Sequence, residues 1–353
     1  MSKAFGFATQ DAKSPLGPFQ FERRDLRPDD VRIEIRYCGI CHTDLHLARN
    51  DWGVTTYPCC PGHEIVGRVA EVGTAVSKFK VGDLAAIGCL VDSCGTCDQC
   101  RRGEEQFCRN GYTLTYNGRD KATGELTHGG YSNHIVAREA FVLRVPEKLD
   151  LARAAPLLCA GITVYSPLRK HKAGKGTRLG VAGLGGLGHM AVKIGVALGC
   201  EVTVITSSES KRADALALGA HKVLLSSDKE AMAALASGLD LILDTIPVTH
   251  DLEPSLGLLD VEGTLVIVGA IAQMPGYHTR SLLRGRRSIS ASPIGGIAET
   301  QALLEFCAEK GVLPDCEMIP IQQVNHAFER MERADVKYRF VIDMASLAKV
   351  PAS

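Results

Sequence analysis

The fold of the central part of the chain is decided by the stretch Leu179-Gly180-Val181-Ala182-Gly183-Leu184-Gly185-Gly186-Leu187-Gly188. A short apolar run is followed directly by the pattern G-x-G-x-x-G. Glycines at these positions permit a tight turn and a close approach of a ligand to the backbone, and a helix that begins there can hold a pyrophosphate at its N-terminus. Taken alone, the pattern also fits a glycine-rich turn without a ligand, so its context has to decide.

That context is a repeated alternation of short apolar runs with helix-length segments. The runs are Leu179–Ala182, Glu201–Ile205, Leu239–Leu243 and Thr264–Val268. Short buried strands separated by helices predict a parallel sheet that is covered on both faces. We therefore predict a doubly wound α/β domain of the Rossmann type. Its phosphate-binding loop comprises Gly183, Gly185, Gly186, Leu187 and Gly188.

The end of the second predicted strand indicates which dinucleotide binds. It reads Ile205-Thr206-Ser207-Ser208-Glu209-Ser210-Lys211-Arg212. A domain that binds NAD usually places an acidic residue roughly twenty residues after the glycine motif, to hold the ribose hydroxyls. Here Ser207 and Ser208 can donate hydrogen bonds to a 2′-phosphate, and Lys211 or Arg212 can balance its charge. We interpret Glu209 as facing solvent, so the sequence favours NADP(H).

The first part of the chain follows a different pattern. Short β-branched runs such as Val31–Ile35 and Ile65–Val69 alternate with turns rich in glycine, proline and aspartate. This pattern is typical of a loop-rich β domain. The change of pattern near residue 152 therefore predicts two domains.

A group of four cysteines lies within the β-rich part: Cys94, Cys97, Cys100 and Cys108, spaced C-x2-C-x2-C-x7-C. Four thiolates complete the coordination of a tetrahedral Zn²⁺, so this spacing predicts a structural zinc site. An iron–sulfur cluster of the bacterial ferredoxin type would have a shorter last gap and a following proline, whereas Arg109 follows here. A disulfide framework is disfavoured because the chain has thirteen cysteines, an odd number, scattered along its length.

A second metal site is indicated upstream. The chain reads Gly39-Ile40-Cys41-His42-Thr43-Asp44 and later Pro61-Gly62-His63-Glu64. Cys41 and His63 are ligand types that zinc prefers, but two protein ligands leave the coordination incomplete. Since a reactive zinc keeps a position for water or substrate, the incomplete set predicts a catalytic site.

Composition excludes several classes of protein. The chain has 353 residues, 45% of them hydrophobic and 23% charged, and a formal net charge of +0. It lacks a basic stripe, which argues against nucleic acid or an anionic membrane as the main partner. The first residues lack the pattern of a signal peptide, and no apolar span of eighteen residues exists. We therefore expect a cytoplasmic enzyme with a small-molecule substrate.

Taken together, the two zinc motifs and the dinucleotide motif resemble those of the zinc-dependent medium-chain alcohol dehydrogenases, nearly from end to end. The stretches that are similar to the cinnamyl-alcohol-dehydrogenase branch, and especially to its bacterial broad-specificity aldehyde reductases, are Cys41–His46, Asn50–Gly53, Pro61–Gly67, Pro156–Thr163 and Val336–Val341.

The resemblance implies the fold and the assembly. It implies a GroES-like, β-rich catalytic domain formed by residues 1–152 and 294–353, around a Rossmann domain formed by residues 153–293. The active site would lie in the cleft between them, and the protein would be a homodimer. Beyond the glycine loop and the residues after the second strand, the cofactor contacts implied by the family are Thr163, Val268, Gly269, Ser292 and Ile294.

The resemblance also completes the catalytic metal site. Cys159 matches the third protein ligand beside Cys41 and His63, although without the family it would be interpreted as a buried apolar cysteine. Glu64 matches a carboxylate that can approach the metal when its fourth position is vacant. Asp44 matches an acceptor that fixes the tautomer of His63 and raises its basicity.

Four further residues receive roles from the resemblance. Thr43 would pass a proton to the developing alkoxide and His46 would supply it by way of the cofactor ribose; by spacing alone both are turn residues after a strand. Trp52 would line the substrate cleft, with a packing role as the alternative. Leu114 stands where plant cinnamyl-alcohol dehydrogenases usually have tryptophan, which predicts an open pocket and a broad substrate range unless Leu114 packs in the core.

The sequence therefore predicts an NADP-preferring alcohol dehydrogenase with two zinc ions that acts mainly as an aldehyde reductase. One alternative is a polyol or sugar dehydrogenase of the same superfamily, which the Ser207-Ser208 pair and the stretches that resemble the cinnamyl-alcohol-dehydrogenase branch argue against. Another is a non-catalytic redox sensor that binds zinc and NADPH. Thr43 and His46 distinguish the enzyme from the sensor, because sensing requires no proton relay.

Overall fold

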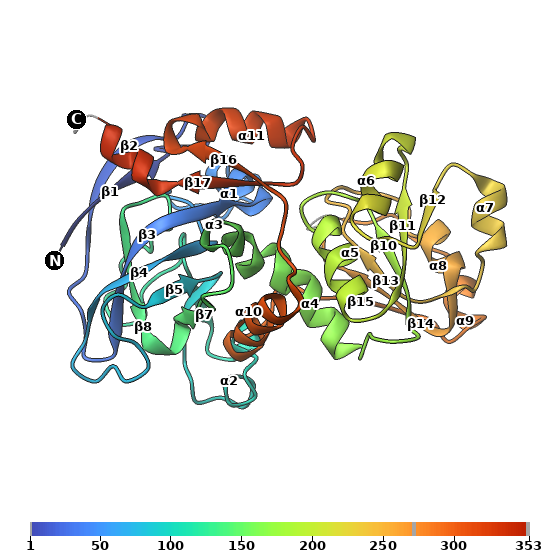
Figure 1. The fold of residues 1–353 in the computed structure, drawn as a ribbon, viewed down its shortest axis with the longest axis horizontal. Helices are drawn as coiled ribbons and strands as arrows, with labels where there is room; N and C mark the ends of the chain where they lie inside the picture. Colours follow the sequence, from blue (N-terminus) through green and yellow to red (C-terminus); the bar gives the residue numbers. More distant parts are fainter. Residues whose placement is uncertain (1, 270–272, 351–353) are drawn as a thin grey trace. The chain divides into compact units, whose positions relative to one another are not determined.

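The chain folds into two compact units in the computed structural model, which describes residues 2–269 and 273–350 (Figure 1). Unit 1 comprises Met1–Cys159 and Gly295–Ser353, and unit 2 comprises Ala160–Ile294. Both ends of the chain therefore belong to unit 1. In the described part of the chain no single helix is long and apolar enough to cross a membrane. The segments Leu151–Leu158 and Ala160–Lys170 have sufficient length and hydropathy only when they are counted together as a bent pair.

Unit 1 is built around a seven-stranded sheet with the order β16-β17-β3-β4-β5-β9, in which β8 also pairs with β3. Its strands are β3 (Asp30–Ile40), β4 (Ile65–Val72), β5 (Leu84–Ile87), β8 (His134–Arg138), β9 (Leu143–Arg144), β16 (Cys316–Pro320) and β17 (Arg339–Asp343). Two smaller sheets pair β1 (Ser2–Ala8) with β2 (Gly17–Arg23) and β6 (Leu90–Ser93) with β7 (Tyr112–Leu114).

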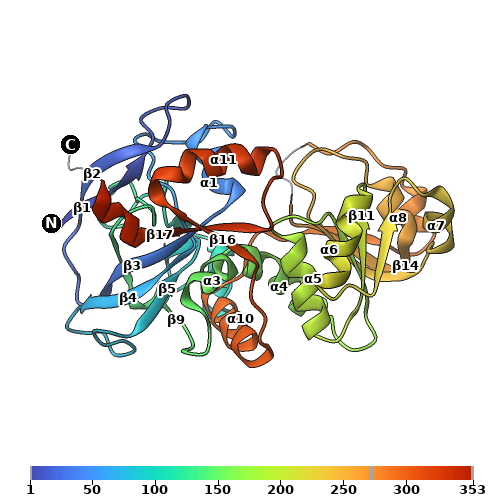
Figure 2. The same ribbon diagram turned by 45° about the horizontal axis from the view of Figure 1, so that its top comes forward.

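Helices cover this sheet or connect its strands. They are α1 (His42–Ala48), α2 (Asp98–Arg101), α3 (Leu151–Ala154), α10 (Ile297–Lys310) and α11 (Val324–Glu332). The 3₁₀ turns are η1 (Glu105–Phe107), η2 (Glu139–Phe141), η3 (Ala155–Leu158), η5 (Ile321–Gln323) and η6 (Met344–Lys349). Figure 2 shows α11 lying beside β16 and β17, so the C-terminal segment completes the core begun by the N-terminal strands.

The pairing of β17 with β3 brings distant parts of the sequence together. The two strands are antiparallel, with Ile342 opposite Cys38 and Phe340 opposite Ile40. The apolar side chains of both strands are buried in one core, and Phe340 and Ile40 are each only 1% exposed. This register places the start of β17 beside the end of β3, immediately before Cys41.

The first boundary between the units follows Cys159 instead of residue 152, and the second follows Ile294 instead of residue 293. The physical reason for the first difference is packing. The turns of α3 and η3 pack against β3 and β4, and Leu157 and Leu158 are almost completely buried. Cys159 therefore belongs to the β-rich unit, although the next residue, Ala160, begins a helix of unit 2.

Unit 2 contains the predicted doubly wound fold. Its six-stranded sheet is parallel throughout and has the order β12-β11-β10-β13-β14-β15. The strands are β10 (Arg178–Ala182), β11 (Glu201–Thr206), β12 (Lys222–Leu225), β13 (Leu239–Asp244), β14 (Leu259–Ile267) and β15 (Ser288–Ala291). The helices are α4 (Ala160–Lys170), α5 (Gly188–Ala197), α6 (Arg212–Ala217), α7 (Lys229–Ala234), α8 (Glu253–Leu258) and α9 (Arg280–Leu283), with η4 (Glu209–Lys211) before α6.

The four strands predicted for this unit are confirmed, and they form the centre of the sheet. Helices α5 and α6 lie on one of its faces and α7, α8 and α9 on the other (Figures 1 and 2). Right-handed crossovers require this arrangement when the strand order reverses after β12. The edge strands β12 and β15 were not predicted, because both are short and partly exposed and neither forms a buried apolar run.

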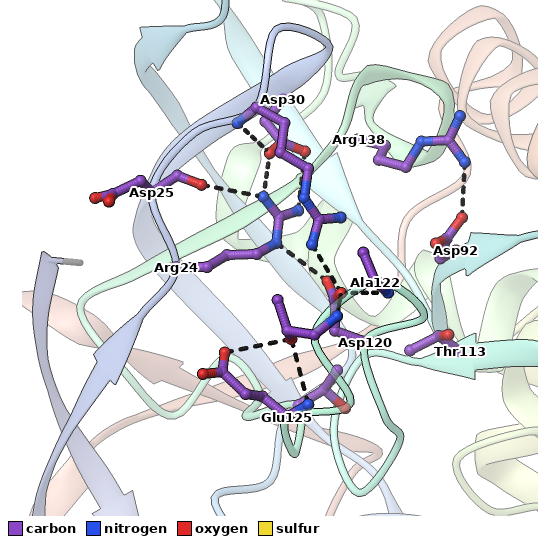
Figure 3. Close-up of polar contacts among 12 residues, drawn as sticks. Arg24, Asp25, Asp30, Asp92, Thr113, Asp120, Ala122, Glu125 and Arg138 are labelled. Atoms are coloured by element: carbon purple, nitrogen blue, oxygen red, sulfur yellow. Dashed lines mark hydrogen bonds and ion pairs between the residues drawn. The ribbon is translucent and has the colours of Figure 1, made fainter.

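A network of ion pairs ties several segments of unit 1 together (Figure 3). Arg24, just after β2, binds both Asp30 at the start of β3 and Asp120 in the loop after β7. Arg138 at the end of β8 binds Asp92 in β6 at 2.8 Å. The Asp30 side chain is fully buried, whereas the side chains of the Arg24–Asp120 and Arg138–Asp92 pairs are partly exposed. Because each of these pairs joins segments that are distant in the sequence, the network connects the loops around the sheet.

Candidate active site and metal centres

One group of potential metal ligands in unit 1 consists of Cys41, His63, Glu64 and Cys159. One ligand atom from each of the four lies within 4.8 Å of all the others. The sulfur atoms of Cys41 and Cys159 are 3.8 Å apart. His63, Glu64 and Cys159 are buried. The fold therefore brings together the residues that the family resemblance groups, from three separate parts of unit 1.

A single buried carboxylate holds two of these ligands in place. Strand β3 ends at Ile40, and Asp44 in the first turn of α1 accepts a hydrogen bond from the backbone N–H of Cys41 at 2.9 Å. Its other oxygen accepts from the N–H of Gly62 at 3.0 Å and lies 3.1 Å from Nδ1 of His63. Since a carboxylate accepts, Nδ1 carries the proton and Nε2 keeps the lone pair that a metal needs.

The electrostatics of the group suit a divalent cation. The pKa of Cys41 lies well below its ordinary value because Cys159 donates a hydrogen bond to its sulfur and His63 and Arg339 add positive charge, which together outweigh burial. Burial lowers the pKa of His63, but the Asp44 carboxylate raises it well above the ordinary value, so a metal that binds Nε2 must displace a proton from it. The thiolate is the form of cysteine that binds metal. Two thiol ligands and one imidazole fit Zn²⁺, with one position left for substrate.

Glu64 forms a buried ion pair with Arg339, which opens β17. The carboxylate of Glu64 is fully buried and the guanidinium of Arg339 is 5% exposed. Burial raises the pKa of Glu64 to about 7, although Arg339 opposes that shift. Its oxygen Oε2 finds no hydrogen-bond partner in the described part of the chain, so it remains available as an acceptor beside the other ligands.

Sequence reasoning assigned no role to Arg339 or to Cys89, although both lie at this site. Arg339 precedes the apolar run Phe340–Ile342, and a charged residue at the start of such a run is a signal that could have found it. Cys89 fits neither predicted zinc motif, which suggests a buried apolar cysteine. It is instead partly exposed and hydrogen-bonded to the Cys159 thiol, which lowers the pKa of Cys89.

The two residues predicted to relay a proton lie on α1. The hydroxyl of Thr43 is 3.6 Å from the sulfur of Cys41. Nδ1 of His46 is 2.7 Å from a carboxylate oxygen of Asp51. The ring of Trp52 lies against His46, with 5.2 Å between ring centroids. Thr43 is therefore next to the metal ligands, and Trp52 is next to the second relay residue.

Leu114 ends strand β7, where it lies opposite Leu90 of β6. Its side chain is partly exposed, whereas Leu90 is only 2% exposed. Two residues further on, the ring of Tyr116 stacks on the imidazole of His63. Leu114 thus lies outside the fully buried core and close in sequence to a residue of the candidate site.

The second candidate metal centre is the four-cysteine group. One sulfur from each of Cys94, Cys97, Cys100 and Cys108 lies within 4.8 Å of the others. Backbone N–H groups of Thr96 and Cys97 donate to the sulfur of Cys94 and lower its pKa to about 5. All thirteen cysteines are free thiols in the structure, and the convergence of these four sulfur atoms favours a metal site over a disulfide framework. Four thiol groups that converge in this way fit a closed tetrahedral zinc site.

Replacing Cys97 with serine is expected to lower the melting temperature and to reduce bound zinc from two ions to one per chain. The segment between Cys94 and Cys108 forms only α2 and η1, so metal coordination must supply most of its order. Metal analysis and thermal melting test this, with Cys316→Ser at a partly exposed cysteine as the control. A Cys97→Ser protein with unchanged zinc content and melting temperature would contradict a structural site.

The glycine-rich loop of unit 2 has the geometry that a dinucleotide requires. It follows β10 and leads into α5, which begins at Gly188. Gly183 has φ +88°, and a Cβ at Gly188 would lie 2.2 Å from the carbonyl oxygen of Gly183. A Cβ at Gly185 would meet no atom within 4 Å, so the chain is open at that point. Glycine is favoured at Gly183 by the positive φ and at Gly188 by the close carbonyl oxygen. The loop can therefore approach a pyrophosphate closely.

The residues expected around the adenosine ribose follow β11. Ser207 is exposed, and the hydroxyl of Ser208 is 2.7 Å from that of Ser210. Arg212 is engaged by a salt bridge to Glu209, with 2.5 Å between the guanidinium and a carboxylate oxygen. The expectation that Glu209 faces solvent on this turn is confirmed, because its side chain on η4 is 62% exposed; it also pairs with Arg212, one of the two cations proposed for a 2′-phosphate.

The other predicted cofactor contacts lie in the same unit. Val268 and Gly269 follow β14, and their N–H groups donate to the carbonyl of Asp244 at 2.9 and 3.0 Å. Ser292 and Ile294 follow β15 and are partly exposed. Parallel strands share one carboxyl edge, which is where ligands of such sheets bind. Thr163 differs, because it is buried in α4 with 4% exposure.

A β-rich unit with two cysteine-containing ligand groups and a parallel dinucleotide-binding unit together define a zinc-binding dehydrogenase. Residues 27–147 match the alcohol dehydrogenase GroES-like domain, and residues 186–309 match the zinc-binding dehydrogenase domain. The chain belongs to the zinc-binding alcohol dehydrogenase family, and it is an oxidoreductase of the cinnamyl-alcohol-dehydrogenase type.

Individual relatives cover nearly the whole chain. The chain is 48% identical to the NADP-dependent alcohol dehydrogenase C of Mycobacterium bovis, over 98% of this chain and 100% of that protein. It is 50% identical to a mannitol dehydrogenase of Apium graveolens, over 99% of this chain and 96% of that protein. A solved cinnamyl alcohol dehydrogenase of Sorghum bicolor is similar with a TM-score of 0.94 and 46% identity, covering 98% of both chains.

Proposed function

We propose that the protein is an NADP(H)-preferring aldehyde reductase that converts aromatic and aliphatic aldehydes to primary alcohols. The observation that carries the proposal is the buried set of Cys41, His63 and Cys159 with the Thr43 hydroxyl 3.6 Å from the Cys41 sulfur. Such a set offers a metal one open position and places a proton donor beside it.

The residues that would hold the catalytic zinc are Cys41, His63 and Cys159, with Glu64 within reach of the same point. When bound, zinc supplies Lewis-acid polarisation of the carbonyl group, which favours attack by hydride from the nicotinamide. The Asp44 carboxylate keeps the imidazole of His63 in the tautomer that leaves Nε2 free. The charge of Arg339 offsets the negative charge of the thiolates and of Glu64.

The proton would reach the alcohol product through this chain's own side chains. The Thr43 hydroxyl can donate a proton to the product oxygen and take one in return. His46 is held by Asp51 through Nδ1, which leaves Nε2 to exchange a proton with the cofactor ribose or with water. A sensor without catalysis would need neither group.

The proposed preference for NADP(H) rests on Ser207, Ser208, Lys211 and Arg212, of which Arg212 also pairs with Glu209. The name of the Mycobacterium bovis relative, an NADP-dependent enzyme, supports it. Two hydroxyl groups and a cation suit a phosphate better than they suit the bare ribose hydroxyls.

Replacing Ser207 with aspartate is expected to lower kcat/KM for NADPH at least ~10-fold, which corresponds to about 1.4 kcal/mol, and to raise the relative use of NADH. A carboxylate repels the 2′-phosphate and accepts hydrogen bonds from the free hydroxyls of NADH. Steady-state kinetics with both cofactors test this, with Ser77→Asp in unit 1 as the control for added charge. A wild-type protein that already prefers NADH would refute the assignment of the ribose pocket.

The second candidate is a polyol dehydrogenase. The mannitol dehydrogenase of Apium graveolens is as similar to this chain as the other relatives are, so the family stretches do not exclude that activity. We propose that Trp52 and Leu114 line the substrate pocket, and an apolar wall favours aldehydes over polyols. The decisive test compares benzaldehyde, cinnamaldehyde and hexanal with NADPH against mannitol with NADP⁺ and NAD⁺. Turnover of mannitol alone would favour the polyol enzyme, and no turnover of any substrate would favour the sensor.

The proposed assembly is a homodimer in the cytoplasm. In unit 2, β15 is an edge strand with partly exposed residues, and Leu283 just before it is 78% exposed. An unpaired edge flanked by exposed apolar side chains favours association with a second copy. Light scattering of the purified protein tests the dimer.

A further inference from the structure

Tyr116 contacts the candidate active site, although it is neither a predicted metal ligand nor a member of the predicted proton relay. It lies two residues beyond β7 and is 3% exposed. Its ring stacks on the imidazole of His63 with 5.8 Å between the centroids and 28° between the planes. On its other sides it packs with the buried side chains of Leu47 and Cys59. The Tyr116 ring is therefore fixed, and one of its contacts is a metal ligand.

The hydroxyl of Tyr116 lies in the field of the Asp44 carboxylate. Burial, and after it the charge of Asp44, raise the pKa of the Tyr116 phenol well above its ordinary value. Its oxygen is buried and finds no hydrogen-bond partner in the described part of the chain. A phenylalanine would fill the same space without burying a hydroxyl group. The contact of Tyr116 with the metal ligands is therefore made by its ring, which stacks on His63.

Asp44 by itself leaves the orientation of the imidazole incompletely determined. It binds His63 through Nδ1 only, by one contact of 3.1 Å. A single hydrogen bond fixes the position of Nδ1 but permits the ring to tilt about it, which moves Nε2. A flat neighbour against the face of the ring restricts that tilt. Partners of this kind around metal-binding histidines typically change metal affinity by 10–100-fold.

We propose that Tyr116 is a positioning residue that holds the His63 imidazole against Asp44 and thereby slows the loss of the catalytic zinc. The proposal rests on the catalytic zinc site assigned under the proposed function. The ring carries the effect, because it contacts the imidazole directly.

The test measures the release of zinc from the folded holoprotein to an excess of a zinc-binding dye. In the Tyr116→Leu variant, release of one zinc per chain is expected to be at least ~10-fold faster than in wild type. The zinc of the four-cysteine site is expected to leave at the wild-type rate, which makes it an internal control. Tyr116→Phe keeps the ring, so its release rate is expected to stay within about threefold of wild type.

Phe141→Leu, a matched aromatic-to-leucine change at a buried residue of the same unit, controls for general loosening of the core. It is expected to lower the melting temperature without altering zinc release. Equal acceleration in Phe141→Leu, or release at the wild-type rate from folded Tyr116→Leu, would overturn the proposal. If Tyr116→Leu does not fold, Tyr116→Met, which fills the space flexibly, is measured in its place. A wild-type protein that holds only one zinc per chain would instead refute the catalytic zinc assignment.

Discussion

Turnover of the Thr43→Val variant is expected to be lower than that of wild type by roughly 10²-fold or more, while both zinc ions remain bound. Valine keeps the shape of threonine and removes the hydroxyl. That hydroxyl is 3.6 Å from the sulfur of Cys41, so it lies beside a metal ligand. A loss of 10²-fold in rate corresponds to about 2.7 kcal/mol of transition-state stabilisation.

Steady-state kinetics with NADPH and an aldehyde, together with metal analysis of the same samples, test this expectation. Thr264→Val is the matched control, because it makes the same change in strand β14 of unit 2, where a β-branched residue fits well. Substitution of His46 is expected to have a milder effect, since water can replace the last member of a relay. Unchanged turnover in Thr43→Val would refute its role in proton transfer.

The second large effect is expected on stability when Arg339 is replaced by methionine. The variant leaves the carboxylate of Glu64 fully buried without its cation. Breaking a buried ion pair by removing one partner typically costs 3–5 kcal/mol, so the free energy of unfolding of unit 1 is expected to fall by about that amount. The effect exceeds that of ordinary surface substitutions, which rarely change stability by more than about 0.5 kcal/mol.

Urea unfolding followed by tryptophan fluorescence measures this change selectively, because Trp52 is the only tryptophan of the chain and belongs to unit 1. Arg49→Met is the matched control. It breaks the exposed pair with Glu332, in which both side chains are about two-fifths exposed, and is expected to cost less than about 1 kcal/mol. Equal losses in the two variants would show that burial of the Glu64–Arg339 pair has no special weight.

Most of unit 2 could be predicted from the sequence. Its four central strands are continuous apolar runs, and their spacing by helix-length segments indicates a parallel sheet. The edge strand β15 escaped prediction because its residues, Ser288–Ala291, are half polar and not fully buried. An edge strand pairs with only one other strand and is less buried, so its sequence shows less of the continuous apolar run that identifies a central strand.

The candidate active site could be predicted only in part. The resemblance to a known family supplied Cys159, because nothing in the run Leu157-Leu158-Cys159 distinguishes a ligand from a core cysteine. Arg339 and Tyr116 were given no role, since their partners Glu64 and His63 lie far away in the sequence. The salt bridge between Arg212 and Glu209 was also missed, although the two residues are only three apart.

The sequence by itself determined the features whose parts are close together along the chain. The glycine loop between β10 and α5 is one, and the four-cysteine group is the other, with all its ligands between Cys94 and Cys108. Local periodicity and spacing are sufficient to predict these features, because residues within one short segment stay close together in the folded chain. Physical reasoning from the residue types and their spacing is therefore enough to predict both features.

Only the tertiary structure decided how the distant residues of the active site combine. The antiparallel register of β17 on β3 brings Arg339 to Glu64, and the packing of η3 on the same sheet brings Cys159 to Cys41. These contacts depend on strand pairing and core packing across more than a hundred residues, which no local pattern encodes. Burial, hydrogen bonds and neighbouring charges then set the pKa values of these groups together, and all three are properties of the assembled core.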